Sequence, residues 1–111
     1  MDAFTLSEAL RRQQAGGRPW LELLSVRDLS CGLYVLPAGG VDDQQPHTED
    51  EVYVVLAGRG RFTAGDETRD VAPGDVIFVA ARTAHRFHDV AEELRIIVVF
   101  GPAEHTRAPG P

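Results

Sequence analysis

The sequence contains no lysine, so all 11 of its basic residues are arginines. The absence of lysine excludes every mechanism in which a lysine amine forms a Schiff base with a carbonyl substrate. Acidic residues outnumber the arginines, at 17, and the net charge is −6. A negatively charged surface disfavours binding to nucleic acid or to an anionic membrane. We therefore expect a small-molecule ligand or substrate, with no nucleic acid and no membrane as partners.

Cysteine is almost as scarce, since Cys31 is the only one. A single cysteine excludes an intrachain disulfide and any Cys-x-x-Cys metal or redox motif. We interpret Cys31 as a small apolar strand residue, and the alternative is a reactive thiol. The N-terminus lacks both a basic region and an apolar core of the kind found in signal peptides, and no apolar run approaches the roughly 18 residues of a membrane span. We therefore expect a cytoplasmic protein.

The chain of 111 residues, 43% of them hydrophobic, suits one domain around one core. The segment Thr5-Leu6-Ser7-Glu8 has the pattern of a capping box and predicts a helix that runs to about Gln14. The glycines and the proline of residues 15–19 end it, because they favour a left-handed cap and break the hydrogen-bond ladder. We expect a helix and arm over residues 1–19, a β-barrel over 20–104 and a flexible tail over 105–111.

Short apolar runs separated by turn residues follow the helix. An all-β sandwich or barrel is the fold that such evenly spaced runs predict. The longest connection, residues 38–50, is polar and rich in possible metal ligands. The eight runs are residues 20–26, 30–37, 51–57, 60–64, 67–72, 75–79, 85–90 and 94–100.

Alternation along the strands brings several ligand-type side chains to one face. In a strand that continues from about residue 45, residues of odd number share a face: Gln45, His47, Glu51, Tyr53 and Val55. His85 and Phe87 form a second pair of equal parity on a distant strand. Two imidazoles and one carboxylate make a set that holds a transition metal and leaves coordination positions open.

Each of these residues also has an interpretation without a metal. His47 suits an exposed loop, Glu51 a solvated strand edge, and His85 a hydrogen-bonded core position. Glu51, however, opens the apolar run 52–57, which would bury an unpaired carboxylate at a considerable cost in free energy. A bound metal ion offsets that cost, so the three residues together favour a metal site.

Two segments have the spacing of known motifs. Gly39, Gln45, His47, Glu51 and Gly58 follow the pattern G-x5-H-x-H-x3,4-E-x6-G, except that a glutamine replaces the first histidine. Further on, residues 73–79 contain a Pro-Gly-Asp turn and a strand, and residues 84–87 contain a histidine segment. The chain thereby resembles the small single-domain cupins over roughly residues 30–100. The resemblance implies a double-stranded β-helix, also called a jelly roll, with a metal ion inside its wider mouth.

The second motif departs from the pattern in its turn residues. Ala80 and Arg82 replace a proline and a glycine before His85, and Asp89 replaces an asparagine after it. We expect these changes to alter a turn and leave the metal site in place.

The glutamine matters more, because an amide oxygen is a neutral, harder and weaker ligand than an imidazole. Gln44 competes with Gln45 for this position, since Pro46 can bulge the strand and break the alternation. We expect His47, Glu51 and His85 to be metal ligands, with one of the two glutamines as the fourth.

Three further residues are candidates for a substrate pocket: Tyr53, Phe87 and Arg82. For the two aromatic residues, plain core packing explains the pattern equally well. His88 has the opposite parity to His85 and should face outward, and His105 should be solvated in the tail.

The even-numbered residues of the same strand, Val52, Val54 and Leu56, form an apolar row on the opposite face. Such a row needs a cover, which a second subunit or the segment around Trp20 can supply. We expect a homodimer.

Three functions remain open from the sequence. A mononuclear Fe, Mn, Ni or Zn metalloenzyme acts on a small organic substrate, and the resemblance to cupins implies a dioxygenase or an isomerase. The alternative is a non-catalytic module that binds or senses a small molecule, and a third is a purely structural dimer, because the fold hosts all three classes. No catalytic base stands out beyond the ligands.

Overall fold

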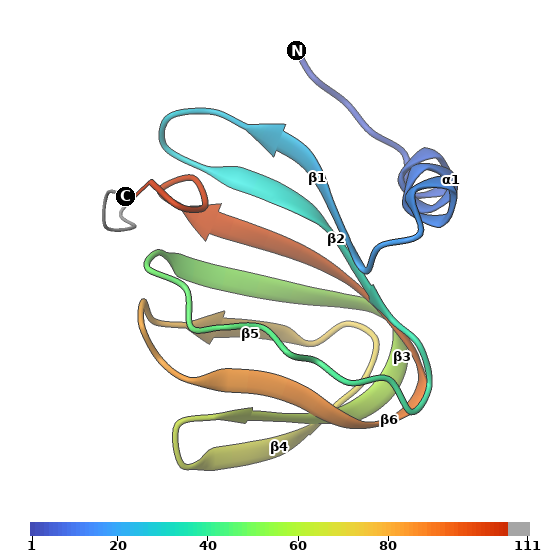
Figure 1. Cartoon of the computed structure of the whole chain (residues 1–111), viewed down its shortest axis with the longest axis vertical. Helices are drawn as coiled ribbons and strands as arrows, with labels where there is room; N and C mark the ends of the chain where they lie inside the picture. Colours follow the sequence, from blue (N-terminus) through green and yellow to red (C-terminus); the bar gives the residue numbers. More distant parts are fainter. Residues whose placement is uncertain (107–111) are drawn as a thin grey trace.

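Strands supply almost all of the regular structure in the computed structural model, which describes residues 1–106 (Figure 1). The all-β fold expected from the sequence is confirmed. No helix among these residues has the length and hydropathy needed to cross a membrane. The end of the expected tail, residues 107–111, lies outside the described residues. The elements in chain order are α1 (Leu6–Gly16), β1 (Trp20–Ser25), β2 (Ser30–Leu36), β3 (Asp50–Ala64), β4 (Glu67–Val71), β5 (Val76–Val79) and β6 (His85–Gly101).

The helix α1 begins and ends as its capping residues dictate. The Thr5 hydroxyl accepts a hydrogen bond from the Glu8 amide at 3.1 Å, as the capping box predicts. The helix continues to Gly16, two residues beyond the predicted Gln14, because the left-handed cap falls on the second glycine, Gly17, at φ 70°. Ala9 is buried against Leu33 and Val35 of β2, so α1 covers one part of the sheet.

Four of the eight predicted runs merge in pairs into two long strands. β3 contains the runs 51–57 and 60–64, and β6 contains the runs 85–90 and 94–100. Irregularities in the β3–β6 pairing between Val55 and Arg61 mark the point where both strands bend. A β-bulge bends a strand without ending it, so the glycines that indicated turns in the sequence lie in a bulge instead.

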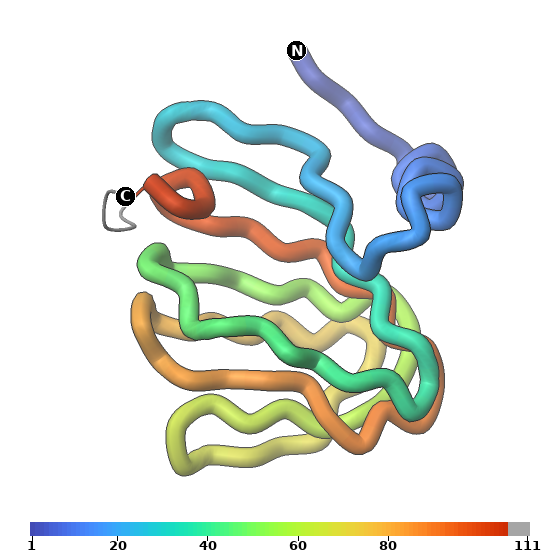
Figure 2. The backbone as a smooth tube through the Cα atoms, in the orientation of Figure 1, coloured from blue at the N-terminus to red at the C-terminus, as the bar shows by residue number. Residues whose placement is uncertain are grey.

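The bent strands make two sheets continuous with each other. One sheet consists of β1, β2, the C-terminal half of β6, the N-terminal half of β3, and β5, and the other consists of the remaining halves of β3 and β6 with β4. The sheets curl around a shared interior, as the tube in Figure 2 shows. In the strand order of the described residues, β1 and β4 are the two ends and do not pair with each other, so the jelly roll is open on one side.

The pairing register decides which side chains face the interior. Directly paired residues share a face, so Gly32, Val98, Tyr53 and Ile77 form one inward row across β2, β6, β3 and β5. Tyr53 also belongs to an aromatic cluster that fills the core, in which the ring centroids of Tyr53, Phe62 and Phe87 lie 4.6–5.5 Å apart. The rings of Tyr53 and Phe62 each lie 6.0 Å from the His85 ring.

The segment before β3 is a loop, and the expectation of a strand from about residue 45 is wrong. Residues 41–47 have no regular secondary structure, and β3 begins at Asp50. Pro46 has no N–H to donate to a strand ladder, which removes one of the hydrogen bonds a strand would need here. The loop is held at one end by the Gly39 amide, which donates to the Val90 carbonyl at 2.8 Å, and at the other by the Arg82 amide, which donates to the His47 carbonyl at 2.6 Å.

Gly58 lies in the bulge where the two sheets join, and we predict that replacing it with alanine destabilises the fold. Its φ is 94°, and an added Cβ would lie 2.6 Å from the carbonyl carbon of Glu93. Gly58→Ala should lower the free energy of unfolding by about 2–4 kcal/mol, because it adds a backbone clash to a left-handed conformation.

Gly65→Ala is the matched control, since Gly65 also has a positive φ, of 59°, but open space around it. Its cost should be about 1 kcal/mol. Urea titrations of both variants measure the difference, and equal costs would show that the crowding at Gly58 is unimportant.

Candidate metal centre

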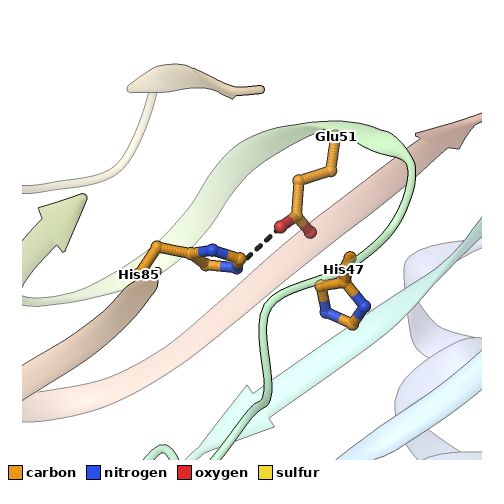
Figure 3. A group of neighbouring side chains, drawn as sticks. All are labelled: His47, Glu51 and His85. Atoms are coloured by element: carbon orange, nitrogen blue, oxygen red, sulfur yellow. Dashed lines mark ion pairs between the residues drawn. The ribbon is translucent and has the colours of Figure 1, made fainter. Parts of the chain in front are cut away.

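The side chains of His47, Glu51 and His85 lie next to one another (Figure 3). One ligand atom from each lies within 4.8 Å of the others. His47 comes from the loop, Glu51 from the second residue of β3, and His85 from the first residue of β6. Glu51 faces inward because it pairs directly with Phe100 on one side and Val79 on the other, both of which are buried. Three segments distant in sequence therefore present donor atoms to one point.

The Thr83 carbonyl sets the tautomer of the His85 imidazole. Nδ1 of His85 lies 2.7 Å from the Thr83 carbonyl oxygen, so Nδ1 carries the hydrogen and donates it. The lone pair is then on Nε2, which faces Glu51. Burial disfavours the charged imidazole, but the Glu51 carboxylate and the Thr83 carbonyl outweigh it and raise the pKa of His85.

The contact between Glu51 and His85 is close but poorly formed as a hydrogen bond. Nε2 of His85 lies 2.6 Å from Oε1 of Glu51. Even so, among the residues that the structure describes, neither carboxylate oxygen of Glu51 nor Nε2 of His85 has a hydrogen-bond partner of acceptable geometry, and all three atoms are buried. Unpaired buried polar atoms are rare, because each loses its hydration without compensation. A cation placed between them would satisfy all three, so the donor set fits a metal ion.

His47 is held from two sides. Its Nε2 lies 3.1 Å from Oε1 of Gln44, and its Nδ1 lies 3.5 Å from Oε2 of Glu104. The ring of Phe100 packs against the imidazole with centroids 4.7 Å apart. The Glu104 carboxylate favours a hydrogen on Nδ1, whereas the Gln44 amide oxygen can only accept a hydrogen from Nε2, so the two neighbours favour opposite tautomers. Burial raises the pKa of Glu104, while the charges of His105 and His47 oppose that change.

Glu104 is a site residue that the sequence analysis did not identify. It lies beside His47 because the chain after β6 folds back: the Glu104 amide donates to the Ser30 hydroxyl and the His105 amide donates to Oε1 of Glu49, both at 2.8 Å. No periodic pattern leads to a residue beyond the last strand, so nothing in the sequence pointed to it.

Asp42 orients the amide of Gln44. The Gln44 side-chain amide nitrogen lies 3.0 Å from Oδ2 of Asp42, and a carboxylate can only accept there. The amide oxygen is therefore the atom directed at His47. Asp42 itself is buried and accepts from the Tyr34 hydroxyl and the Phe87 amide, both at 2.8 Å. Asp42 was also absent from the sequence-based site, although it lies two residues before Gln44 in the polar loop.

The two glutamines occupy different surroundings. Gln44 is half-buried beside His47, whereas the side chain of Gln45 is exposed. Of the two glutamines left open by the sequence, Gln45 would share a face with His47 only in a strand, and this segment is a loop. In this loop Gln44, and not Gln45, lies beside His47.

The predicted pocket residues lie below and outside the site. Tyr53 and Phe87 are 0% and 1% exposed and pack in the aromatic core, where the Tyr53 and His85 ring centroids are 6.0 Å apart. Burial, with the nearby charge of Glu51, raises the pKa of Tyr53. Arg82 is exposed on the turn before β6, in a left-handed conformation with φ 64°.

The other two histidines, His88 and His105, lie outside the cluster of His47, Glu51 and His85. His88 is half-buried, with Nε2 2.7 Å from the Thr63 hydroxyl and Nδ1 2.8 Å from Asp89. His105 is exposed, with Nε2 3.6 Å from Glu104.

Comparison with known proteins adds a family and a set of similar structures. The model of the cupin domain matches residues 32–100. An uncharacterized protein of Streptomyces coelicolor is 47% identical over 104 residues, which cover 94% of this chain and 99% of that protein. An RmlC-like cupin from Methanocaldococcus jannaschii, described as a double-stranded β-helix, superposes with a TM-score of 0.67 at 16% identity, over 75% of this chain and 78% of that one. The DMSP lyase DddQ of Ruegeria pomeroyi gives a TM-score of 0.65 at 22% identity, over 77% of this chain and 42% of that one.

Proposed function

Because the chain belongs to the cupin domain family, we propose that it binds one divalent transition metal ion through His47, Glu51 and His85. The observation that carries the proposal is the set of buried atoms without a hydrogen bond of acceptable geometry, namely both carboxylate oxygens of Glu51 and Nε2 of His85. A metal ion would turn three destabilising atoms into ligands.

The donor set suits Fe(II), Mn(II), Ni(II) or Zn(II), because imidazole and carboxylate ligands bind all four. Bound there, the metal would supply a Lewis acid with open positions for a substrate oxygen or a water molecule. The chain itself orients the imidazoles: the Thr83 carbonyl fixes His85, and Glu104 lies beside Nδ1 of His47. Phe100 packs against the His47 ring and limits its rotation.

We predict that the purified protein carries about one transition metal ion per chain, the stoichiometry of a mononuclear site. His85→Ala should lose most of this metal, because it removes a buried ligand. His88→Ala is the control, since His88 bonds to Thr63 and Asp89 away from the site. Elemental analysis of the three proteins gives the answer, and equal metal in wild type and His85→Ala would eliminate the site.

We further propose Gln44 as the fourth ligand. Its amide oxygen lies 3.1 Å from Nε2 of His47, and its amide nitrogen is fixed by Asp42, so the oxygen is aimed at the site. A neutral amide oxygen binds a metal more weakly than an imidazole does, and it favours harder ions. A bidentate substrate can displace such a ligand, which would let Gln44 act as the exchangeable member of the set.

Histidine substitutions test this assignment. Gln44→His should tighten metal binding, because an imidazole replaces an amide, while Gln45→His should leave it unchanged because Gln45 is exposed. Gln44→Ala should cost far less affinity than His47→Ala. Metal titrations at one fixed pH are needed, since protons compete with the metal for the new imidazole. Unchanged affinity in both histidine variants would leave a three-ligand site completed by water.

The reaction we propose is of the dioxygenase or isomerase type, on a small organic substrate. One protein of similar fold, DddQ, is described as a lyase, and this chain spans only 42% of its length. The alternative is a non-catalytic module that binds or senses a small molecule. That alternative needs no catalytic base, and the sequence offers none that stands out beyond the proposed ligands.

We also propose a homodimer through the outer face of β3 and β5. Across the sheet, Leu33, Ile97, Val54 and Val76 form one outward row, since each pairs directly with the next. The helix α1 covers Leu33 and Ile97, whereas Val76 and Phe78 on β5 are 66% and 64% exposed. A second copy that presents the same row would cover this apolar surface.

Light scattering tests the dimer. We predict a mass twice the 12.1 kDa of one chain at micromolar concentration. Phe78→Asp should shift the mass to that of one chain, because it places a charge in the apolar row. Val26→Asp is the control, since Val26 is also exposed, at 49%, but lies in the β1–β2 hairpin. A wild-type protein of monomer mass would contradict the proposal.

A further inference from the structure

A cavity of about 680 Å³ opens beside His47. Its size falls within the range of sites that bind small molecules. Its walls come from β1, β2, β6, the loop before β3 and the turn after β6, and the side chains that matter most are Trp20, Tyr34, Gln44, His47, Val98 and Phe100. Tyr53, Phe87 and Arg82 are not among the described residues that line it. The cavity is therefore distinct from the pocket that the sequence suggested.

The indole of Trp20 is the largest aromatic surface in the cavity wall. Trp20 pairs directly with Tyr34, so both side chains face the interior. Its six-membered ring lies over Gly32, where an added Cβ would stand 2.7 Å from Cζ2 of the indole. Phe100 meets the indole edge-on at a centroid distance of 6.1 Å. Gly32 and Phe100 thus hold the ring in place, and the half-buried indole still lines the cavity.

The charges around the cavity do not select an ion. Arg18 lies at its rim, and it forms no ion pair with any residue that the structure describes. Asp43 and Glu104 line the same cavity with the opposite charge. In the metal-free protein, an anionic ligand would be attracted by Arg18 and repelled by Asp43 and Glu104, and a cation the reverse. Next to the His47 ring lie the neutral amide oxygen of Gln44, 3.1 Å from Nε2, and the carboxylate of Glu104, 3.5 Å from Nδ1.

We propose that the cavity binds a planar, uncharged aromatic molecule that stacks on Trp20 and turns one oxygen toward His47. Aromatic walls favour a flat ring over a puckered ring of the same size, because ring pairs gain free energy beyond the apolar area that they bury. Only the direction of the oxygen rests on the proposed metal site, since recognition of the ring depends on stacking against Trp20.

The test compares phenol with cyclohexanol, which have the same ring size and a single hydroxyl group but differ in planarity. Trp20 is the only tryptophan, so its fluorescence reports directly on the cavity. Both compounds are titrated into wild-type protein from which metal has been removed with a chelator. Phenol should bind roughly 2- to 13-fold more tightly than cyclohexanol, the range expected for one aromatic pair. It should also change the Trp20 emission.

Two variants assign the preference to the indole, with binding measured by calorimetry because they lack the fluorophore. Trp20→Phe keeps an aromatic face and should keep most of the preference for phenol. Trp20→Leu is the matched apolar variant, and its two affinities should be equal. Circular dichroism and thermal unfolding confirm that the variants fold as the wild type does.

The outcomes separate this proposal from the metal site. Equal affinities in the wild type, no binding of either compound, or a preference that survives in Trp20→Leu would overturn the aromatic ligand while leaving the metal content untouched. If the purified protein takes up no metal but still prefers phenol, the aromatic ligand is supported and only the metal centre is contradicted.

Discussion

A carboxylate buried inside a β-sheet structure is the constraint on which the rest of this site depends. Glu51 is 2% exposed and lies between Phe100 and Val79, in a position where an aliphatic residue would be the ordinary choice. Among the described residues, Nε2 of His85 lies 2.6 Å from one of its oxygens as an ion pair, yet neither oxygen nor this Nε2 has a hydrogen bond of good geometry. An apolar pair of similar volume would cost less free energy there, so the arrangement makes physical sense as a place for a cation.

The parts of the site that regular strands carry could be predicted from the sequence. The alternation of side chains placed Glu51, Tyr53, His85 and Phe87 on inward faces, and the structure has them there, because each belongs to a strand whose partners enforce the period of two. Where the chain leaves the strands, that period carries no information. Gln44 and His47 reach the site from a loop whose course depends on the hydrogen bonds of Asp42, Val90 and Arg82.

The predicted strand ends near Gly58 and between residues 90 and 94 were wrong for a similar reason. Gly58 and the residues after it resemble a turn in sequence, yet β3 and β6 run through this point because their bulges coincide and bend both strands together. A bulge and a turn use the same residue type for the same reason, a positive φ, so only the pairing across the sheet distinguishes them. Glu104 was beyond reach for a related reason, since its position follows from bonds to Ser30 and Glu49, which are distant in sequence.

Phe100 and Gln44 belong to both the site and the cavity, and this joins the proposed metal centre to ligand recognition. Phe100 packs against the His47 imidazole on one side and meets the Trp20 indole on another. Gln44 lines the cavity and lies next to Nε2 of His47. A ring that stacks on Trp20 would therefore lie beside the side chain proposed as the weakest ligand. Because Asp42 fixes the Gln44 amide through its nitrogen, displacement of the oxygen requires that hydrogen bond to lengthen or break. The buried Asp42 carboxylate also accepts hydrogen bonds from the Tyr34 hydroxyl and the Phe87 amide, so it would stay in place while the Gln44 oxygen moved.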